Sequence, residues 1–225
     1  MSRVSICIPT YEMENATEFL RRNLSSILIQ SFKDYEVVIS DNSDNDEIWD
    51  LCQEFMDLMV ISYYRNSQKG MAINSNNAID NAKGELVKIL FQDDYFYDET
   101  SLWTIVRHFT HWTQWLVTGC LHSTNGQLFN QHWPFYSESE NTIGSPSVLT
   151  MRREIKERFD PQYKWVLDLD LYQRLFRKYG KPKVIDKVNV VIGLGSHQET
   201  YKLPTEIKLK EHQLLKEKYD TSFTS

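Results

Sequence analysis

The stretch Gly84-Glu-Leu-Val-Lys-Ile-Leu-Phe-Gln-Asp-Asp94 decides the fold that this sequence predicts. Residues 86–90 are mostly apolar and branched, which is typical of a buried strand in a parallel sheet. Asp93 and Asp94 follow the carboxyl end of that strand, where open α/β sheets bind their ligands. Paired carboxylates at such an edge suit a hard divalent cation that carries a phosphate. The alternative is a pair of solvated turn residues or a helix cap.

The composition excludes several classes of protein. The chain has 225 residues, of which 41% are hydrophobic and 25% charged, as is ordinary for one soluble globular domain. No apolar run approaches the roughly 18 residues of a membrane span. The net charge of -6 argues against a general nucleic-acid-binding surface.

The cysteines and the start of the chain lead us to expect a cytoplasmic protein. Cys7, Cys52 and Cys120 lie far apart, which fits buried free thiols in a reducing compartment. The chain enters a predicted strand at Val4, and this leaves no room for a signal peptide.

The first part of the chain alternates between predicted strands and helices. The strands are expected at 4–8, 35–40, 59–64 and 86–90, and amphipathic helices at 17–30, 48–56 and 71–82. This alternation predicts an α/β fold with a Rossmann-like, mostly parallel central sheet and helices on both faces. Parallel strands end at the same edge, so the polar residues that follow them should converge there.

The second part of the chain predicts a more irregular arrangement. Asn125-Gly126 is a two-residue turn signal for a small antiparallel hairpin between strands at 115–121 and 127–133. A helix over 168–179 is closed by Gly180. The remaining predicted elements are a helix at 98–109, strands at 147–151 and 184–194, and a charged peripheral helix after Pro204.

Four pieces of this sequence together resemble family 2 glycosyltransferases of the GT-A fold. They are Pro9-Thr-Tyr11, Asp41, Gln92-Asp-Asp94 and Asp168-Leu-Asp-Leu-Tyr-Gln-Arg-Leu175, in the family's order within a resemblance that runs from Val4 to about Thr200. The resemblance implies a nucleotide-diphospho-sugar transferase built as one domain over 1–225. It divides into a nucleotide-sugar-binding half (1–95), an acceptor and catalytic half (96–200) and a C-terminal helix (201–225).

The resemblance implies where the nucleotide binds. In the family the loop after the first strand lies against the base and ribose, which assigns that role to Pro9, Thr10, Tyr11 and Glu12. Asp41 would accept a hydrogen bond from a pyrimidine imide N–H, which favours uracil or thymine over cytosine. The alternative for the loop is a plain turn between a strand and a helix.

Three further polar residues resemble family positions near the ribose or diphosphate. Asn66 and Asn77 flank a segment like the family's Asn-x-Gly…Asn sequence, and Gln92 stands nearer the ribose. Each asparagine could equally serve a turn or a buried amide network. Lys69 could reach a phosphate or remain a solvated charge.

The metal motif departs from the commoner Asp-x-Asp form, because Phe91 stands where the first Asp usually is. Aligned by the strand, Asp93 matches the metal-binding Asp, and Asp94 is a supporting residue or an alternative ligand. His197 matches a position where a His joins the metal or pyrophosphate, although a lone loop His often has no such role. One Mn²⁺ or Mg²⁺ would neutralise the diphosphate leaving group.

The resemblance places the general base at Asp168. An inverting transfer needs one carboxylate opposite the departing diphosphate to take the proton of the acceptor hydroxyl. Asp170 lies about 200° further round the helix and should matter much less. The alternative is that Asp168 only caps the helix. His111, Trp112 and Trp115 are candidates for an acceptor groove, since sugar faces stack on aromatic rings.

We therefore expect a metal-dependent, inverting glycosyltransferase. Its partners would be a pyrimidine-diphosphate sugar, most simply a UDP-sugar, and a carbohydrate or other hydroxyl acceptor, with no nucleic acid. One alternative is an inactive module that binds a nucleotide sugar or a carbohydrate, which the altered metal motif favours and Asp168 disfavours. A metal-dependent nucleotidyltransferase is the other, but residues 10–15 offer no basic group to grip phosphates.

Overall fold

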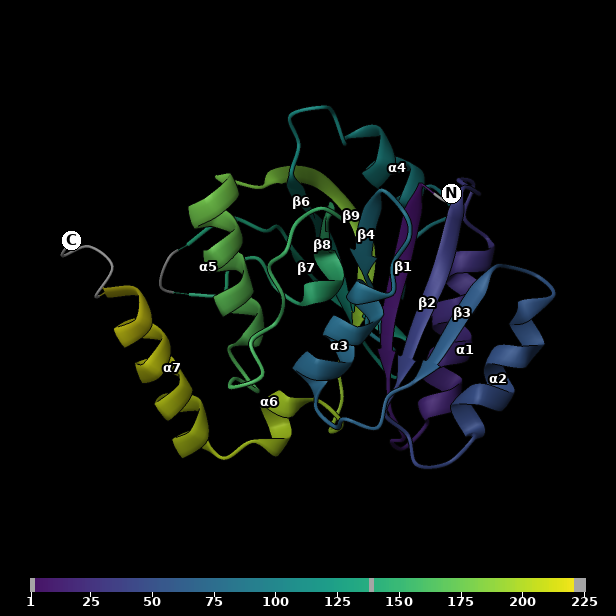
Figure 1. Cartoon of the computed structure of the whole chain (residues 1–225), viewed down its shortest axis with the longest axis horizontal. Coiled ribbons are helices and arrows are strands. Elements are labelled where there is room, and N and C mark those ends of the chain that lie inside the picture. The colour runs from purple at the N-terminus through teal and green to yellow at the C-terminus, as the bar shows by residue number, and fades with distance from the viewer. Residues whose placement is uncertain (1–2, 138–139, 221–225) are drawn as a thin grey trace.

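The computed structural model describes residues 3–137 and 140–220 of the chain. It shows a mixed α/β fold in which helices surround a mostly parallel sheet (Figure 1). The predicted fold class is therefore confirmed. The last five residues of the expected C-terminal segment, 221–225, lie outside the described residues.

The first half alternates between strands and helices as predicted. Its elements are β1 (Val4–Thr10), α1 (Ala16–Leu28), β2 (Tyr35–Asp41), α2 (Glu47–Met56), β3 (Ile61–Arg65), α3 (Met71–Asp80) and β4 (Leu86–Ile89). All seven residues of β1 and of β2 are buried. Pairing in β3-β2-β1-β4 is parallel throughout, so the carboxyl ends of these strands lie at one edge.

The second half adds antiparallel pairs and the C-terminal helices. Its elements are β5 (Tyr95–Phe96), α4 (Ser101–Arg107), β6 (Trp115–Thr124), β7 (Gln127–His132), a 3-10 turn (Pro146–Val148), β8 (Leu149–Arg152), α5 (Leu167–Tyr179), β9 (Lys183–Gly193), α6 (Glu199–Lys202) and α7 (Thr205–Asp220). The predicted hairpin is present, and Asn125 and Gly126 both have positive φ, as its two-residue turn requires. The short elements β5 and α6 were not predicted.

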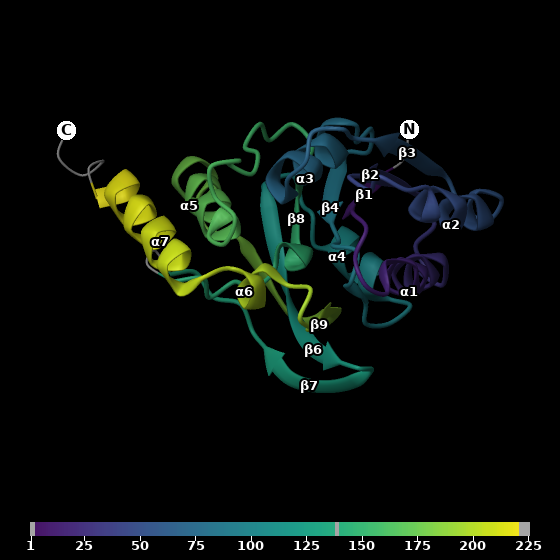
Figure 2. The same ribbon diagram turned by 90° about the horizontal axis from the view of Figure 1, so that it is seen from below.

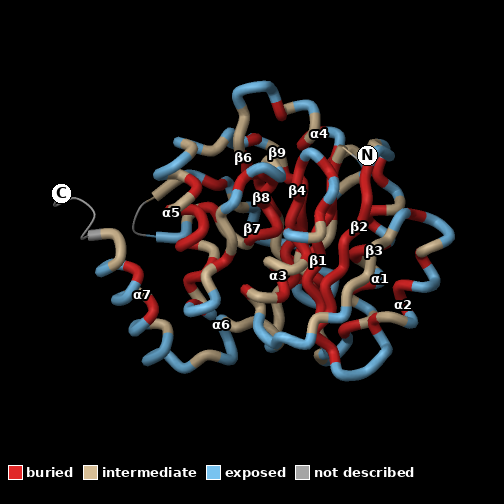
Figure 3. The backbone as a smooth tube through the Cα atoms, viewed as in Figure 1, coloured by how far each residue is buried: buried red, intermediate tan, exposed pale blue. Residues whose placement is uncertain are grey.

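The strands form one sheet in the order β3-β2-β1-β4-β8-β6-β9-β5, with β7 beside β6. Figure 2 shows α1 and α2 on one side of β1 and β2 and α3 on the other. The strands at the centre are buried, whereas much of α7 faces solvent (Figure 3). The described helices include none that is both long and apolar enough to span a membrane.

The expected end of the first strand at residue 8 is wrong, because β1 continues through Thr10 and pairs Pro9 with Ser40 of β2. Neighbouring β4 pairs with β1 only as far as Cys7. Pro9 therefore needs no N–H on that side, which is the condition under which a strand tolerates proline. The extension carries β1 to the edge of the site.

Candidate functional site

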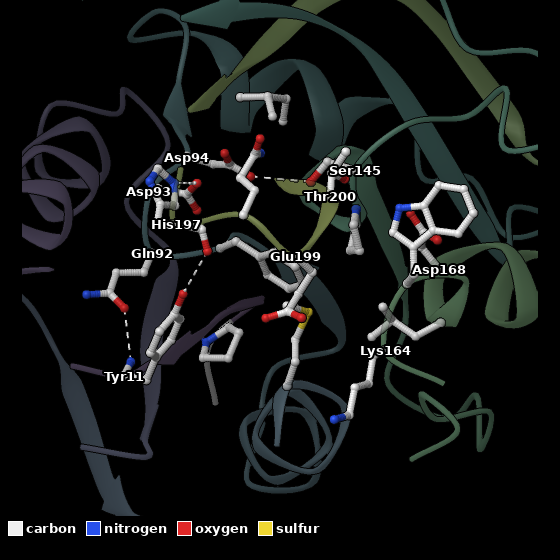
Figure 4. Close-up of a pocket in the computed structure, with 18 of the residues that line it drawn as sticks. Tyr11, Gln92, Asp93, Asp94, Ser145, Lys164, Asp168, His197, Glu199 and Thr200 are labelled. Carbon is white, nitrogen blue, oxygen red and sulfur yellow. Dashed lines mark hydrogen bonds and ion pairs between the residues drawn. The ribbon is translucent and has the colours of Figure 1, made fainter. Parts of the chain in front are cut away.

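A cavity of about 860 Å³ opens at the carboxyl ends of β1 and β4, within the size range of small-molecule sites. It extends from the loops after β1 and β4 to Asp168 of α5 and Glu199 of α6 (Figure 4). Of the predicted site residues, those that line it are Pro9, Tyr11, Glu12, Gln92, Asp93, Asp94, Asp168 and His197. Those that do not are Thr10, Asp41, Asn66 and Asn77.

Asp93 and His197 meet on one side of the cavity although they lie far apart in the sequence. His197 Nε2 is 2.7 Å from Asp93 Oδ2, and each side chain is 14% exposed. The Phe19 ring lies against the imidazole, with ring centroids 5.0 Å apart, and the Tyr11 hydroxyl donates to the His197 carbonyl at 3.4 Å. Arg22 donates to the Asp93 carbonyl at 2.7 Å, so the backbone on which the carboxylate stands is held as well.

This pair fits part of a divalent-metal site. The described residues contain no group of three or more His, Cys, Asp or Glu side chains placed to hold a metal. Asp93 and His197 nevertheless bring an oxygen and a nitrogen donor to one point of the cavity wall. Magnesium in phosphate-binding sites commonly has only one or two protein ligands, with substrate phosphates and water completing the sphere. The donor set is therefore compatible with a metal that arrives with a diphosphate.

The Asp94 carboxylate hydrogen-bonds to two segments that lie far from it in the sequence. Its Oδ1 accepts a hydrogen bond from the Gly193 N–H at 2.8 Å, its Oδ2 accepts one from the Ser145 hydroxyl at 3.4 Å, and the residue is 2% exposed. Burial and the neighbouring Asp93 charge raise the pKa of the Asp94 carboxyl. A Cβ at Gly193 would lie 2.5 Å from the Asp93 carbonyl oxygen, so only glycine fits there. Asp94 thus joins β4, β9 and the 144–146 segment.

Asp168 stands in the first turn of α5, and Figure 4 shows it across the cavity from Asp93. Its Oδ2 accepts a hydrogen bond from Asn141 Nδ2 at 2.6 Å, and its Oδ1 accepts one from the Leu169 N–H at 2.8 Å. Burial raises its pKa to about 7, while these hydrogen bonds act in the opposite direction. A carboxylate with a pKa near neutrality is suited to take and release a proton.

The Asp170 side chain does not line the cavity, in agreement with the helical spacing. It nevertheless has a structural role, so replacing Asp170 is not an inert control for replacing Asp168. It is 0% exposed, and its carboxylate accepts hydrogen bonds from Arg174 at 2.6 and 2.9 Å, from Lys218 at 2.7 Å and from the Tyr219 hydroxyl at 2.8 Å. The expectation that Asp170 matters little overlooked this buried cluster, because the partners on α7 lie almost fifty residues away in the sequence.

Asp41 lies inside the wall of the cavity. It is 0% exposed; its Oδ1 accepts from the Ser43 N–H and hydroxyl at 2.9 and 2.6 Å, and its Oδ2 accepts from the Tyr63 hydroxyl at 2.5 Å. The Thr10 hydroxyl also donates to it at 3.2 Å. In this arrangement both oxygens have protein partners, so contact with a base would require the Tyr63 hydroxyl to move. The structure thus differs from the expectation that the Asp41 carboxylate is free to accept a hydrogen bond from a base.

The predicted amide residues mostly hold loops. Gln92 accepts from the Tyr11 N–H and donates to the Ala16 carbonyl, both at 3.0 Å, and so fixes the loop after β1. Asn77 donates to the Ser40 hydroxyl at 2.7 Å, away from the cavity. Asn66 accepts from a neighbouring N–H, while its Nδ2 is buried without a partner among the described residues.

Two asparagines that the sequence reasoning missed do line the cavity. Asn74 is 3% exposed and donates to the Thr10 carbonyl at 2.8 Å, which ties α3 to the end of β1. Asn42 donates to the Asn66 carbonyl at 2.7 Å and accepts from the Gly70 N–H at 3.2 Å. Buried amides of this kind follow no sequence period, so only the fold identifies them.

The aromatic residues expected to form an acceptor groove lie elsewhere. Trp115 is 1% exposed and donates to the Gly180 carbonyl, whereas Trp112 is 85% exposed and packs only edge-on against His111. None of these three lines the cavity. Trp165, which precedes Asp168 by three positions, does line the cavity.

Other cavity-lining residues come from segments to which the sequence analysis gave no site role. They are His122, Asn141, Lys164, Trp165, Glu199, Thr200, Tyr201 and His212. His212 belongs to α7, the helix expected to be peripheral. These residues meet because α6 and α7 fold back beside α5 (Figure 1).

Solved structures identify the class of fold. Staphylococcus aureus TarS 1-349 in complex with UDP-GlcNAc superposes with a TM-score of 0.71 at 18% identity, covering 96% of this chain and 66% of that one. The mannosyltransferase PcManGT from Pyrobaculum calidifontis, in complex with GDP-Man and Mn²⁺, gives 0.63 at 16% identity, covering 88% and 58%. The chain therefore has the GT-A glycosyltransferase fold.

The chain belongs to glycosyl transferase family 2, whose sequence model matches residues 5–178. It is 34% identical over 96 residues to the UDP-Glc:alpha-D-GlcNAc-diphosphoundecaprenol beta-1,3-glucosyltransferase WfaP of Escherichia coli, a match that covers 43% of this chain and 37% of that protein. It is 26% identical over 213 residues to the putative colanic acid biosynthesis glycosyl transferase WcaA of Escherichia coli, covering 85% and 72%. The match to WfaP thus spans little more than a third of that protein.

Proposed function

We propose that this glycosyltransferase moves a sugar from a UDP-sugar to an acceptor hydroxyl, with inversion at the anomeric carbon and with a divalent cation. The observation that carries the proposal is the cavity itself, which has the Asp93–His197 pair on one side and Asp168 on the other (Figure 4). A donor diphosphate held at the first side would leave its anomeric carbon open to an acceptor beside Asp168.

The donor assignment is supported by the nucleotide half and by the relatives. Tyr11 and Glu12 line the cavity where β1 ends, the position at which α/β sheets bind nucleotides. One relative is named as a UDP-Glc-dependent enzyme, and one structural neighbour is a complex with UDP-GlcNAc. We therefore favour a uridine nucleotide, and we assign to Asp41 the positioning of Ser43 and Thr10 in addition to the predicted contact with the base.

The metal assignment rests on Asp93 and His197, which would hold Mn²⁺ or Mg²⁺ together with the diphosphate. Such an ion acts as a Lewis acid that neutralises the charge of the leaving diphosphate. A Mn²⁺ complex of a structural neighbour supports this choice. Asp94 would contribute by holding Gly193, and through it the segment that leads to His197, against the metal motif.

Asp168 would act as the general base. Its carboxylate must be ionised to take the acceptor proton, and Asn141 holds the Oδ2 side of the carboxylate by a 2.6 Å hydrogen bond. Trp165 offers a flat apolar face to an acceptor sugar on the same side of the cavity. The acceptor is a hydroxyl compound, such as a carbohydrate or a lipid-linked saccharide; two relatives are named for undecaprenol-linked acceptors.

The test is Asp168→Asn, which keeps the size of the side chain but removes its ability to take a proton. Transfer should fall by ~10²–10⁴, the usual contribution of general base catalysis, with UDP affinity unchanged. Glu199→Gln is the matched control, because Glu199 also lines the cavity. If Asp168→Asn transfers sugar at the parental rate, or if Glu199→Gln is the variant that fails, Asp168 is not the base.

Calorimetric titration of UDP, dTDP and CDP, with and without Mn²⁺, tests the donor side. We expect Mn²⁺ to tighten the binding of UDP and CDP to bind at least tenfold more weakly than UDP. A parent protein that binds UDP but shows no turnover with any acceptor would favour an inactive binding module. Release of diphosphate from a nucleoside triphosphate would favour a nucleotidyltransferase.

A further inference from the structure

Helix α7 contacts the segment that carries the proposed base, although it lies beyond residues 5–178 that match the family. Glu211, on α7, is 5% exposed. Its carboxylate accepts hydrogen bonds from three consecutive backbone N–H groups, those of Lys164 at 2.9 and 3.1 Å, Trp165 at 2.8 Å and Val166 at 3.2 Å.

These three N–H groups need an external acceptor. Helix α5 begins at Leu167, and its N-cap residue, Val166, has an apolar side chain that makes no capping hydrogen bond. Of the three, only the Val166 N–H belongs to the unpaired groups at the start of the helix; those of Lys164 and Trp165 precede it, and such a run of successive N–H groups forms a concavity that binds an anion. A carboxylate from another helix satisfies them, and hydrogen bonds to a charged acceptor are stronger than neutral ones.

The capped segment leads directly into the acceptor side of the cavity. Lys164, Trp165 and Val166 line the cavity together with Asp168, two residues after the last N–H that Glu211 binds. His212, next to Glu211, also lines the cavity and meets the Trp165 ring edge-on, with centroids 5.1 Å apart. The direction in which residues 164–168 enter α5 therefore depends on the Glu211 carboxylate.

We propose that Glu211 is a positioning residue for sugar transfer, which holds Asp168 and Trp165 at the acceptor through the backbone of residues 164–166. This inference rests on the proposed function. Catalysis depends steeply on position, because a displacement of about 1 Å at a reacting group can cost ~10²-fold in rate. Glu211 touches no reacting atom; it acts through the segment that it caps.

The remaining contacts of α7 allow Glu211 to be replaced while the helix stays attached to α5. Lys218 and Tyr219 bind the Asp170 carboxylate at 2.7 and 2.8 Å, so they attach the far end of α7 to α5 without Glu211. Glu211→Gln keeps the length of the side chain but removes its charge and replaces one of the two acceptor oxygens by an NH₂ group that cannot accept a hydrogen bond. It should therefore loosen residues 164–166 while α7 stays docked. Glu206→Gln, on the exposed first turn of the same helix, is the matched control.

The experiment measures transfer kinetics, UDP affinity and backbone hydrogen exchange in the parent, Glu211→Gln and Glu206→Gln. In Glu211→Gln we expect kcat to fall by ~10-fold or more, UDP affinity to stay unchanged, and the amides of residues 164–166 to exchange faster. Glu206→Gln should match the parent in all three. Glu211→Asp, which restores the charge on a shorter side chain, should recover part of kcat.

The outcomes separate this inference from the function on which it rests. An active parent whose Glu211→Gln variant keeps the parental kcat, or exchanges its 164–166 amides at the parental rate, overturns the role of Glu211 alone. Loss of UDP affinity in that variant would show general damage to the fold and would also overturn it. A parent that transfers no sugar to any acceptor overturns the proposed function itself.

Discussion

Neutralising Asp170 should destabilise the fold far more than neutralising its neighbour Asp168. The Asp170 carboxylate is 0% exposed and accepts hydrogen bonds from Arg174, Lys218 and Tyr219. Removal of one partner from a buried ion pair costs about 3–5 kcal/mol. The side chains of Arg174 and Lys218 are 27% and 33% exposed, so water can partly solvate them, and we expect about 3 kcal/mol, at the lower end.

For a chain of this length such a loss lowers Tm by about 6–12 °C, since each kcal/mol corresponds to about 2–4 °C. Thermal and urea denaturation of Asp170→Asn at pH 8 would measure it. Asp168→Asn should be at least as stable as the parent at that pH, because burial disfavours the charged Asp168 carboxyl and raises its pKa to about 7.

Glu54→Gln is the matched control, because it breaks an ion pair at the surface, whereas Asp170→Asn breaks one in the interior. The Arg21–Glu54 pair has half-exposed side chains, so its loss should leave Tm almost unchanged. A Tm for Asp170→Asn within about 2 °C of the parent would refute the buried-cluster argument, given the scale of the expected shift.

The remaining predictions concern the cavity. The transfer rate should rise with pH through the Asp168 pKa of about 7, because only the ionised carboxylate can take a proton; a falling or flat profile there would count against the base. Asn141→Ala should move that rising limb to higher pH, since the lost hydrogen bond had stabilised the charged form, and a limb that moves to lower pH would contradict the assignment. Asp93→Ala should abolish the Mn²⁺ enhancement of UDP affinity in calorimetry while Tm stays near the parental value; an unchanged enhancement would remove Asp93 from the metal site. Asp41→Ala should reduce the preference for UDP over CDP, and an unchanged preference would leave it a purely structural role.

The predicted site residues differ in how closely their observed surroundings match the expected ones. The match is best where the position depends only on the element that carries the residue. Asp93 and Asp168 line the cavity as expected, because the first lies shortly after β4 and the second at the start of α5, two regular elements whose period the sequence shows. Asp41 also follows its strand, yet its carboxylate is bound by Tyr63 and Ser43 inside the wall. The position of a residue along a strand predicts the edge that it reaches, but not the partner that its side chain finds.

Long-range packing decided which residues line the side of the cavity that we propose for the acceptor. Trp112 and Trp115 belonged to the densest run of tryptophan and histidine in the chain, and neither lines the cavity. Trp165 and His212 do, because α7 returns to α5 and Glu211 holds residues 164–166. No periodic pattern relates residues almost fifty positions apart, so a sequence alone could not indicate this contact.

The sequence by itself determined the α/β class, the parallel direction of the first strands and the edge at which Asp93 would stand. These follow from hydrophobic period and strand direction, which are local properties of the chain. The tertiary structure alone decided that His197 meets Asp93 at 2.7 Å, that Asp94 faces Gly193, and that Glu211 caps the approach to Asp168. Each of these contacts joins residues brought together only by the packing of the whole domain, and burial sets both their hydrogen-bond partners and the Asp168 pKa.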